Sequence, residues 1–343
     1  MCANKTDPMK KDPPANAIKS IQFDLFSTFV SNDGRNVSNT VEMWESIPKY
    51  FFTPRQVEKL RTDGGLAEPF KWEYSYNGKR CTIKIQPALI EQKDGKYKAF
   101  FPGVTEELVE EALKKILTDQ RHGIHDPKNV ETWVRFSLSM IQRELSARGR
   151  TRSRAEIKHA IEVMSGCTLT FYSEGKEVWR GNILQDLVTV GRDEYIADTD
   201  SLHAARLPLF ISLGINQIDY RQYNYARLMG CDQQLARWIY RRLINRFKQA
   251  DLTNSYHFIF SDLKASGLLQ QGRERDNHKK VMDALQELKD KMVLADFTAE
   301  KTPAGDWKYT VTATGEFVSE QKAANKRRAD SEQKAINAGI SVR

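Results

Sequence analysis

Three arginines, Arg150, Arg152 and Arg154, stand directly before a run of apolar residues with helical spacing. Guanidinium groups bind phosphate, but the start of a helix carries partial positive charge and ordinarily favours Asp and Glu. Ser153 and Glu156 have the spacing of a capping box, which indicates that a helix does begin here. A phosphate at the helix N-terminus would explain the arginines, and a solvated helix end is the alternative.

Two other motifs contain residues that could catalyse a reaction. His122, His125 and Asp126 could bind a metal ion, but Pro127 follows at once, and we interpret HGIHDP as a turn after a helix. The tyrosines of YRQYNYARL could supply a nucleophile for DNA nicking, although packing and helix capping explain them more simply. The sequence contains neither GxxxxGK[ST] nor GxGxxG. We therefore expect no enzyme activity, no cofactor and no metal site.

The composition is typical of a soluble globular protein. The chain has 343 residues, of which 40% are hydrophobic and 29% charged, enough for two or three domains. It has no apolar run long enough to span a bilayer, and its N-terminal lysines are not followed by the apolar core of a secretory signal. The four cysteines include no CxxC pair, which argues against a zinc site and a disulfide framework. These features predict a cytoplasmic protein with no membrane partner.

Positive charge is concentrated in three windows of the sequence. The formal net charge is +8, yet residues 141–160, 236–250 and 264–280 alone carry +4, +5 and +3. Clustered Lys and Arg on helices is typical of proteins that neutralise nucleic-acid phosphates, whereas a membrane-surface helix would also expose Trp and Phe. The predicted DNA contacts are Arg148, Arg150, Arg152, Arg154, Lys158, His159, Arg241, Arg242, Lys248, Arg273, Arg275, Lys279 and Lys280.

The order of elements occurs twice, at a constant offset of 124 residues. TWVRFS (residues 132–137) aligns with YHFIFS (residues 256–261), and two later apolar stripes of helical spacing align at the same offset. Amphipathic helices are predicted before each copy, at Thr105–Gln120 with Thr105 as N-cap and at Asp232–Gln249, and two strand-like runs follow each later helix. This is the order of a winged helix-turn-helix. The two stripes are Ile157, Ala160, Ile161 and Met164, and Val281, Ala284, Leu285 and Leu288.

The predicted fold is α+β, with two tandem winged helix-turn-helix domains and an N-terminal strand-rich extension. Asn77-Gly78 between two strand-like runs predicts a hairpin within that extension. In the helix at residues 232–249, Leu235, Ile239, Leu243 and Phe247 form a buried stripe, which leaves its arginines to phosphate, solvent or acidic residues. The predicted parts are a flexible segment 1–38, a first domain with the extension 39–195, a second domain 196–315 and a basic tail 316–343.

The chain resembles bacterial plasmid replication initiators of the RepA/RepE type, over about two thirds of its length. The resemblance implies specific binding to double-stranded origin repeats called iterons, opening of an adjacent A·T-rich region and control of plasmid copy number. It also implies contacts with the host initiator and replicative helicase, repression of its own gene, and a monomer–dimer equilibrium through the first winged helix. The matching segments are Phe100 to Ile116, Ile141 to Tyr172 and Tyr256 to Thr312.

Two other functions compete with the initiator. A plain transcription repressor would share the DNA-binding chemistry, and a nicking enzyme would cleave supercoiled DNA with a divalent metal. An array of direct repeats beside the gene favours the initiator, whereas an isolated palindrome favours the repressor. The strand-rich segment 72–101 and the basic tail depart from compact family members, and the resemblance gives them no role.

Overall fold

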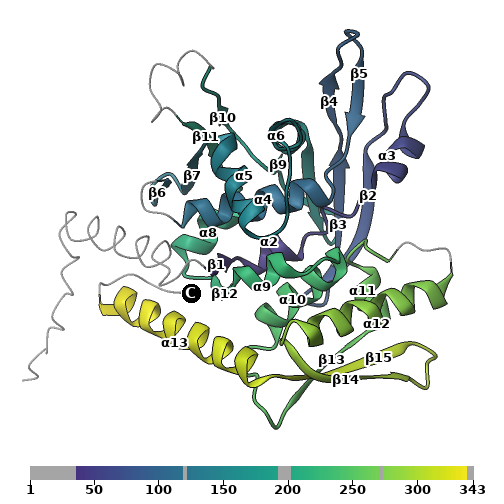
Figure 1. Ribbon diagram of the computed structural model, residues 1–343, viewed down its shortest axis with the longest axis vertical. Coiled ribbons are helices and arrows are strands. Elements are labelled where there is room, and N and C mark those ends of the chain that lie inside the picture. Colours follow the sequence, from purple (N-terminus) through teal and green to yellow (C-terminus); the bar gives the residue numbers. More distant parts are fainter. Residues whose placement is uncertain (1–35, 119–121, 192–201, 270–272, 338–343) are drawn as a thin grey trace, which may run out of the picture.

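The computed structural model describes residues 36–118, 122–191, 202–269 and 273–337 and shows helices combined with several antiparallel sheets (Figure 1). This agrees with the predicted mixed class. Of the predicted flexible segment 1–38, only residues 36–38 are described, and strand β1 (Val37–Thr40) already begins there. The predicted boundary at residues 195 and 196 lies outside the described residues. No helix in the described ranges is long and apolar enough to cross a membrane.

A four-stranded antiparallel sheet joins the N-terminal extension to the first repeat. The predicted hairpin is confirmed, because Asn77 and Gly78 have φ values of 51° and 74°, the left-handed pair that a type I′ turn needs. β3 continues from this hairpin to pair with β8, so the extension and the first wing-like hairpin form one sheet. In sheet order the strands are β2 (Phe70–Tyr76), β3 (Lys79–Gln86), β8 (Thr168–Ser173) and β9 (Lys176–Asn182).

The first repeat contains three helices, and its long amphipathic helix begins earlier than predicted. α4 has Gly103 as N-cap, not Thr105, and ends at Leu117. A Cβ at Gly103 would lie 2.6 Å from the carbonyl oxygen of Phe52, so the chain can pass here only with glycine. The predicted apolar stripe of α6 is buried, as is that of α12 in the second repeat. The helices are α4 (Val104–Leu117), α5 (Leu138–Ala147) and α6 (Arg154–Gly166).

The strand before α5, β7, lies in a different sheet from the hairpin that follows α6. β7 pairs with β6 on one side and β11 on the other, and neither strand of the following hairpin β8–β9 joins it. β6 contains most of HGIHDP, so the prediction of a turn there is wrong: Gly123–Asp126 pairs with β7, and the chain reverses at residues 127–130. In sheet order the strands are β10 (Leu187–Val188), β11 (His203–Arg206), β7 (Glu131–Phe136) and β6 (Gly123–Asp126).

The second repeat keeps its strands together. The strand before α11 pairs directly with the hairpin that follows α12, in the order β13-β15-β14. Its strands are β13 (Ser255–Ile259), β14 (Leu294–Lys301) and β15 (Trp307–Ala313). Its helices are α10 (Gln234–Arg246), α11 (Phe260–Lys264) and α12 (Glu274–Asp290), so α10 is shorter at both ends than predicted.

The remaining elements connect and cover these units. Residues 316–343 were predicted as a basic tail, and most of them form helix α13 (Gly315–Asn337), which buries Phe317, Val318 and Ala324. The last six residues lie outside the described ranges. The other elements are α2 (Glu42–Ser46), α3 (Pro54–Leu60), β4 (Ala88–Glu91), β5 (Tyr97–Phe100), α8 (Leu209–Asn216), β12 (Arg221–Asn224) and α9 (Tyr225–Gly230).

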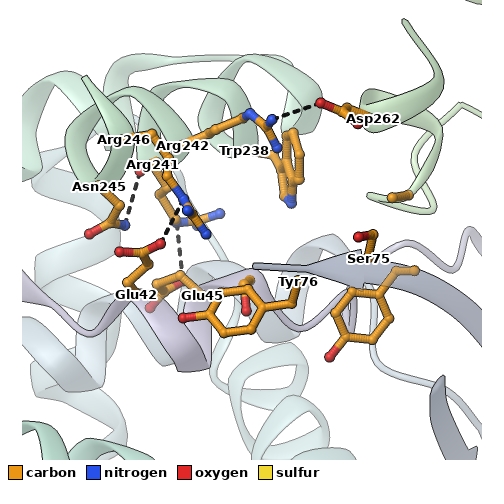
Figure 2. Close-up of a pocket in the computed structure, with 13 residues that line it drawn as sticks. Glu42, Glu45, Ser75, Tyr76, Trp238, Arg241, Arg242, Asn245, Arg246 and Asp262 are labelled. Atoms are coloured by element: carbon orange, nitrogen blue, oxygen red, sulfur yellow. Dashed lines mark hydrogen bonds and ion pairs between the residues drawn. The ribbon is translucent and has the colours of Figure 1, made fainter. Parts of the chain in front are cut away.

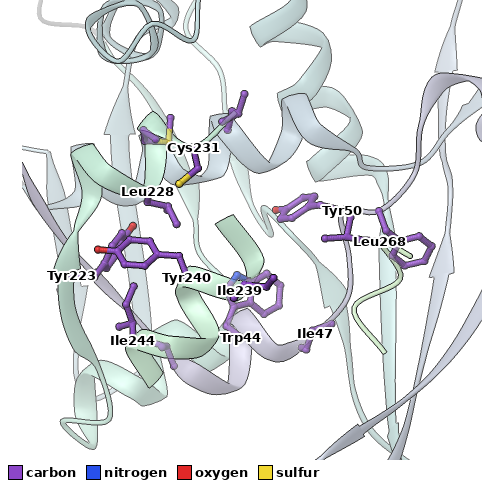
Figure 3. Packing of buried hydrophobic residues seen from close by; sticks show 14 of the residues in the cluster. Trp44, Ile47, Tyr50, Tyr223, Leu228, Cys231, Ile239, Tyr240, Ile244 and Leu268 are labelled. Atoms are coloured by element: carbon purple, nitrogen blue, oxygen red, sulfur yellow. The ribbon is translucent and has the colours of Figure 1, made fainter. Parts of the chain in front are cut away.

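The two repeats share one continuous hydrophobic core. Figure 3 shows Trp44 and Ile47 from the segment around α2 in the same cluster as Ile239, Tyr240 and Ile244 of α10. Trp44, Ile239 and Tyr240 have no exposed surface. Burial of side chains this large contributes about 1.5–3 kcal/mol each, so the core holds the repeats in one arrangement.

Candidate nucleic-acid interface

The start of α6 is fixed by a reciprocal cap. The hydroxyl of Ser153 accepts from the backbone N–H of Glu156 at 3.2 Å, and the carboxylate of Glu156 accepts from the N–H of Ser153 at 2.8 Å. The predicted capping box is therefore confirmed. These hydrogen bonds from Ser153 lower the pKa of Glu156. Because the cap sets the first turn, the side chains of residues 154–158 project from a defined helix end.

Two basic side chains of this helix end face solvent. Arg154 is exposed and has no hydrogen bond or ion pair to any described residue. Lys158 is 69% exposed and lies 3.7 Å from Glu162, an ion pair too exposed to hold it firmly. Arg152 is half-buried, and its Nε donates to the hydroxyl of Thr105 at 3.3 Å. The end of α6 thus presents Arg154 and Lys158, with Arg152 beside them.

Two other arginines of this window point into the protein. Arg150 donates from Nε to the carbonyl of Met229 at 2.7 Å and pairs with Asp232 at 2.6 Å. Arg148 pairs with Glu144 at 3.2 Å, and its guanidinium carbon lies 5.3 Å from the centre of the Tyr225 ring. Both side chains are over four-fifths buried and tie α5 to the segment around α9. We therefore leave them out of the interface.

The second equivalent helix also begins with exposed basic residues. Arg273 is the N-cap residue of α12, and Arg275 and Lys279 lie in its first two turns; all three are exposed and have no ion pair among the described residues. Glu274 and Asp276 occupy the same first turn, where carboxylates complement the helix dipole. Acidic and basic side chains therefore alternate at the start of α12. This pattern suits contacts with particular groups of a DNA site more than a general attraction to phosphates.

Two predicted contacts are half-buried and packed against the protein. The ammonium group of Lys280 donates to the carbonyl of Leu268 at 2.6 Å, and burial lowers the pKa of Lys280. The imidazole of His159 packs edge-on against Phe100 of β5, with ring centres 4.5 Å apart. These contacts hold both side chains on the protein, so they are less available to DNA than Arg154 or Lys279.

The basic helix α10 differs most from its prediction. Arg241 is 8% exposed and Arg237 1% exposed, and both bind Glu107 of α4, at 2.7 and 2.8 Å. Arg241 also lies 3.2 Å from Glu111 and 3.4 Å from Glu45. Arg241 is therefore withdrawn from the predicted DNA contacts, because its charge is satisfied by internal carboxylates.

The remaining contacts predicted on or after α10 also have acidic partners. Arg242 is 26% exposed and lies 3.1 Å from Asp262, and Lys248 is 38% exposed and lies 3.6 Å from Glu42. Both pairs are open to solvent, where an ion pair contributes no more than about 1 kcal/mol. Arg242 and Lys248 are accessible to solvent, but each already has a carboxylate partner.

A network of buried charges forms the contact between α4 and α10. Burial alone would raise the pKa of Glu107, but the guanidinium groups of Arg237 and Arg241 outweigh it and lower that pKa to about 2. On the same face of α4, Lys114 binds Glu45 at 2.6 Å and Glu111 at 2.7 Å, the two carboxylates that Arg241 also approaches. The sequence contains an indication of this contact. Glu107 and Glu111 are four residues apart, as are Arg237 and Arg241, so each pair lies on one face of its helix.

The network sets the positions of α6 and α12. α6 packs on α4, α4 binds α10 through the buried ion pairs, and α10 packs on α12, so the equivalent helices α4 and α10 meet at the centre (Figure 1). α6 and α12 therefore lie at the two ends of this series of contacts.

Comparison with known proteins gives structural neighbours only: no family model matches the sequence, and no curated protein matches it. A selenomethionine structure of RctB domains 2 and 3 has 14% identity and a TM-score of 0.47, covering 79% of this chain and 98% of that chain. A second structure of RctB domains 2–3 has 14% identity and a TM-score of 0.44, covering 77% and 97%. The Pi initiator protein in complex with iteron DNA has 12% identity and a TM-score of 0.36, covering 83% and 100%. Of these neighbours, the Pi protein is an initiator, the class of protein that the sequence resembles.

Proposed function

We propose that this chain is a sequence-specific double-stranded DNA-binding protein that starts plasmid replication at origin repeats. In this proposal the two repeats are winged helices, and α6 and α12 are their recognition helices. The second repeat has the helices and the three-stranded sheet that a winged helix requires. The first has its helices in the same order, while its hairpin β8–β9 is extended by β3.

The main support is the contrast between two sets of basic residues. Arg148, Arg150, Arg237 and Arg241 are neutralised inside the protein, whereas Arg154, Arg273, Arg275 and Lys279 are exposed without ion pairs to described residues. The exposed set lies at the beginnings of the two equivalent helices. In a helix-turn-helix this end approaches base edges and phosphates in the major groove, and its dipole favours a phosphate there.

The initiator role follows from the resemblance described above. It makes iterons the target, and it adds opening of a neighbouring A·T-rich region, repression of the protein's own gene, and contacts with the host initiator and helicase. It also makes the protein cytoplasmic and DNA-associated, with monomers and dimers in equilibrium. The chain's own surface supports DNA binding directly, whereas these further steps depend on the family pattern.

The test is DNA binding by full-length protein and by a double variant, Arg275→Ala with Lys279→Ala. A duplex site is first selected from a random library with the wild-type protein. If the two side chains contact bases, each loss costs about 1–3 kcal/mol of specific binding, and the preference over random DNA falls. Lys289→Ala is the matched control, because Lys289 lies on the same helix but at its other end, paired with Asp296.

Either of two results would count against the assignment of α12. One is equal binding of the selected site by the double variant and the Lys289→Ala control. The other is an equal loss of affinity for selected and random DNA, which would mean that Arg275 and Lys279 contact only the DNA backbone. Failure of the wild-type protein to enrich any duplex sequence would overturn the proposal itself.

A further inference from the structure

A cleft lies between the β2 strand of the N-terminal extension and the helices α10 and α11 of the second repeat. Figure 2 shows Trp238, Arg242 and Arg246 on α10 above Ser75 and Tyr76 of β2. Two adjoining hollows share Tyr74, Arg242 and Arg246 in their walls. The inner one, lined also by Trp238 and Asn245, has a volume of about 70 Å³, and the outer one, which is open to solvent, has a volume of about 680 Å³. That volume is in the range of small-ligand sites, about 300–1,000 Å³.

The cleft wall contains polar atoms whose hydrogen bonding is incomplete. Tyr74 is 7% exposed and Asn245 is 4% exposed, yet the hydroxyl of Tyr74 and Oδ1 of Asn245 have no hydrogen-bond partner in the structure. Nε of Arg242 also has none. The amide nitrogen of Asn245 donates one of its two hydrogens to the carbonyl of Arg241 at 3.0 Å, while its oxygen accepts none. A buried polar group left unpaired costs about 1–3 kcal/mol. A ligand with an N–H donor and an acceptor would supply the missing partners and remove this cost.

The mouth of the cleft is rich in cationic groups. Arg80, Arg242, Arg246 and Lys264 line it together with Glu73 and Asp262, and two further carboxylates, Glu42 and Glu45, line the inner hollow. Arg80 pairs with Glu73 at 2.8 Å, with both side chains more than 60% exposed, and Arg246 is 38% exposed beside Glu42. Exposed pairs of this kind are weak and can be exchanged for a phosphate without a large loss. Lys264 has no carboxylate partner among the described residues.

Aromatic rings complete the inner wall. Trp238 is half-buried on α10 and points toward the strand that carries Ser75 and Tyr76 (Figure 2). The guanidinium of Arg242 lies 5.8 Å from the centre of the Trp238 ring, and that of Arg246 lies 5.6 Å from the centre of the Tyr76 ring. Rings of this kind stack on a flat aromatic ligand, with about 1–3 kcal/mol per base in nucleic-acid complexes.

We propose that this cleft binds one nucleotide, with its base beside Trp238 and Tyr74 and its phosphate at Arg246 and Lys264. A base supplies the N–H donor for Asn245 and the acceptor for Tyr74, and the phosphate supplies the anion for the mouth. The outer hollow is open to solvent, and its volume of about 680 Å³ can hold a single nucleotide. The site is separate from the exposed ends of α6 and α12, so the inference does not depend on the proposed function.

The experiment titrates the full-length protein with AMP, GMP, CMP and UMP, and with phosphate and adenosine alone, by calorimetry and tryptophan fluorescence. We expect saturable binding of at least one nucleotide, tighter than phosphate or adenosine. Tyr74→Phe, which removes only the hydroxyl, should weaken binding about threefold to tenfold. Arg246→Gln should weaken it about tenfold or more, because a charged hydrogen bond is lost.

The matched control is Arg55→Gln, which removes an exposed arginine on α3, outside the cleft, and should leave nucleotide affinity unchanged. Urea unfolding midpoints show that each variant is folded. The inference is overturned by no saturable binding, by equal binding of phosphate alone, or by equal affinities of Tyr74→Phe, Arg246→Gln and the control. It is also overturned if only a single-stranded oligonucleotide binds and mononucleotides do not compete. Duplex DNA binding is measured on the same samples. Duplex binding without nucleotide binding overturns this inference alone, whereas loss of duplex binding alone counts against the proposed function.

Discussion

Replacing Glu107 with glutamine removes one negative charge from the centre of the molecule and keeps the size of the side chain. Glu107 is 2% exposed and accepts from Arg237 at 2.8 Å and from Arg241 at 2.7 Å. In Glu107→Gln both guanidinium groups stay buried, and Arg237 has no other carboxylate partner among the described residues. Breaking a buried ion pair on one side costs about 3–5 kcal/mol, because the other charge stays desolvated.

The pKa of Glu107 gives an independent magnitude. The two arginines lower it from 4.5 to about 2. Each pKa unit corresponds to about 1.4 kcal/mol, so the charged form contributes about 3 kcal/mol to the free energy of unfolding. Since the folded pKa is depressed, this contribution is complete above pH 4.5 and is lost as the pH falls toward 2. The difference between wild type and Glu107→Gln should therefore be largest at neutral pH and should shrink in acid.

Urea unfolding followed by tryptophan fluorescence, at neutral pH and at several acidic values, measures this difference. Glu177→Gln is the matched control, because Glu177 pairs with Arg180 at 2.8 Å on the surface, with side chains 41% and 60% exposed. Its loss should cost less than about 1 kcal/mol. Equal destabilisation by Glu107→Gln and Glu177→Gln, or a Glu107→Gln effect that does not change with pH, would refute the account of the buried network.

Three further predictions concern the interface and the chain that supports it. Duplex binding should weaken with salt, with a slope of log K against log[salt] of about −0.9 for each phosphate neutralised, and affinity that stays flat between low and moderate salt would contradict an electrostatic interface. Ser153→Ala removes the side-chain half of the α6 cap and should cost about 1 kcal/mol in urea unfolding, whereas Ser319→Ala, at an exposed serine of α13, should cost under about 0.5 kcal/mol. Gly267→Ala should cost at least about 2 kcal/mol, since φ is +75° and the new Cβ would lie 2.6 Å from the ring of Phe51; a midpoint within error of wild type would show that this loop gives way.

Local patterns were predictable from the sequence. The capping box at Ser153, the left-handed turn at Asn77-Gly78 and the buried stripes of α6 and α12 depend on residues close together in the chain, and the structure contains each of them. The repeat was visible for the same reason, because the same buried positions recur at one offset. The exposed starts of α6 and α12 follow directly from these local features.

Long-range pairing was not predictable in the same way. Arg241 has its carboxylate partner 134 residues earlier in the chain, and Arg150 binds the segment around residues 229–232. A basic helix face looks the same in sequence whether a phosphate or a buried glutamate neutralises it. The pairing of β3 with β8 and of β7 with β11 was not predictable for the same reason, because the residue pattern of a strand does not specify its neighbour in the sheet.

The central claim is that one chain reads two adjacent major grooves with α6 and α12. Hydroxyl-radical footprinting on the selected duplex site, with light scattering of the same complex, tests it most directly. The account predicts one chain per site and two asymmetric patches of protection about one helical turn apart, over roughly 20 base pairs. Two chains bound about a dyad, with symmetric protection and one patch per chain, would contradict it and favour a repressor.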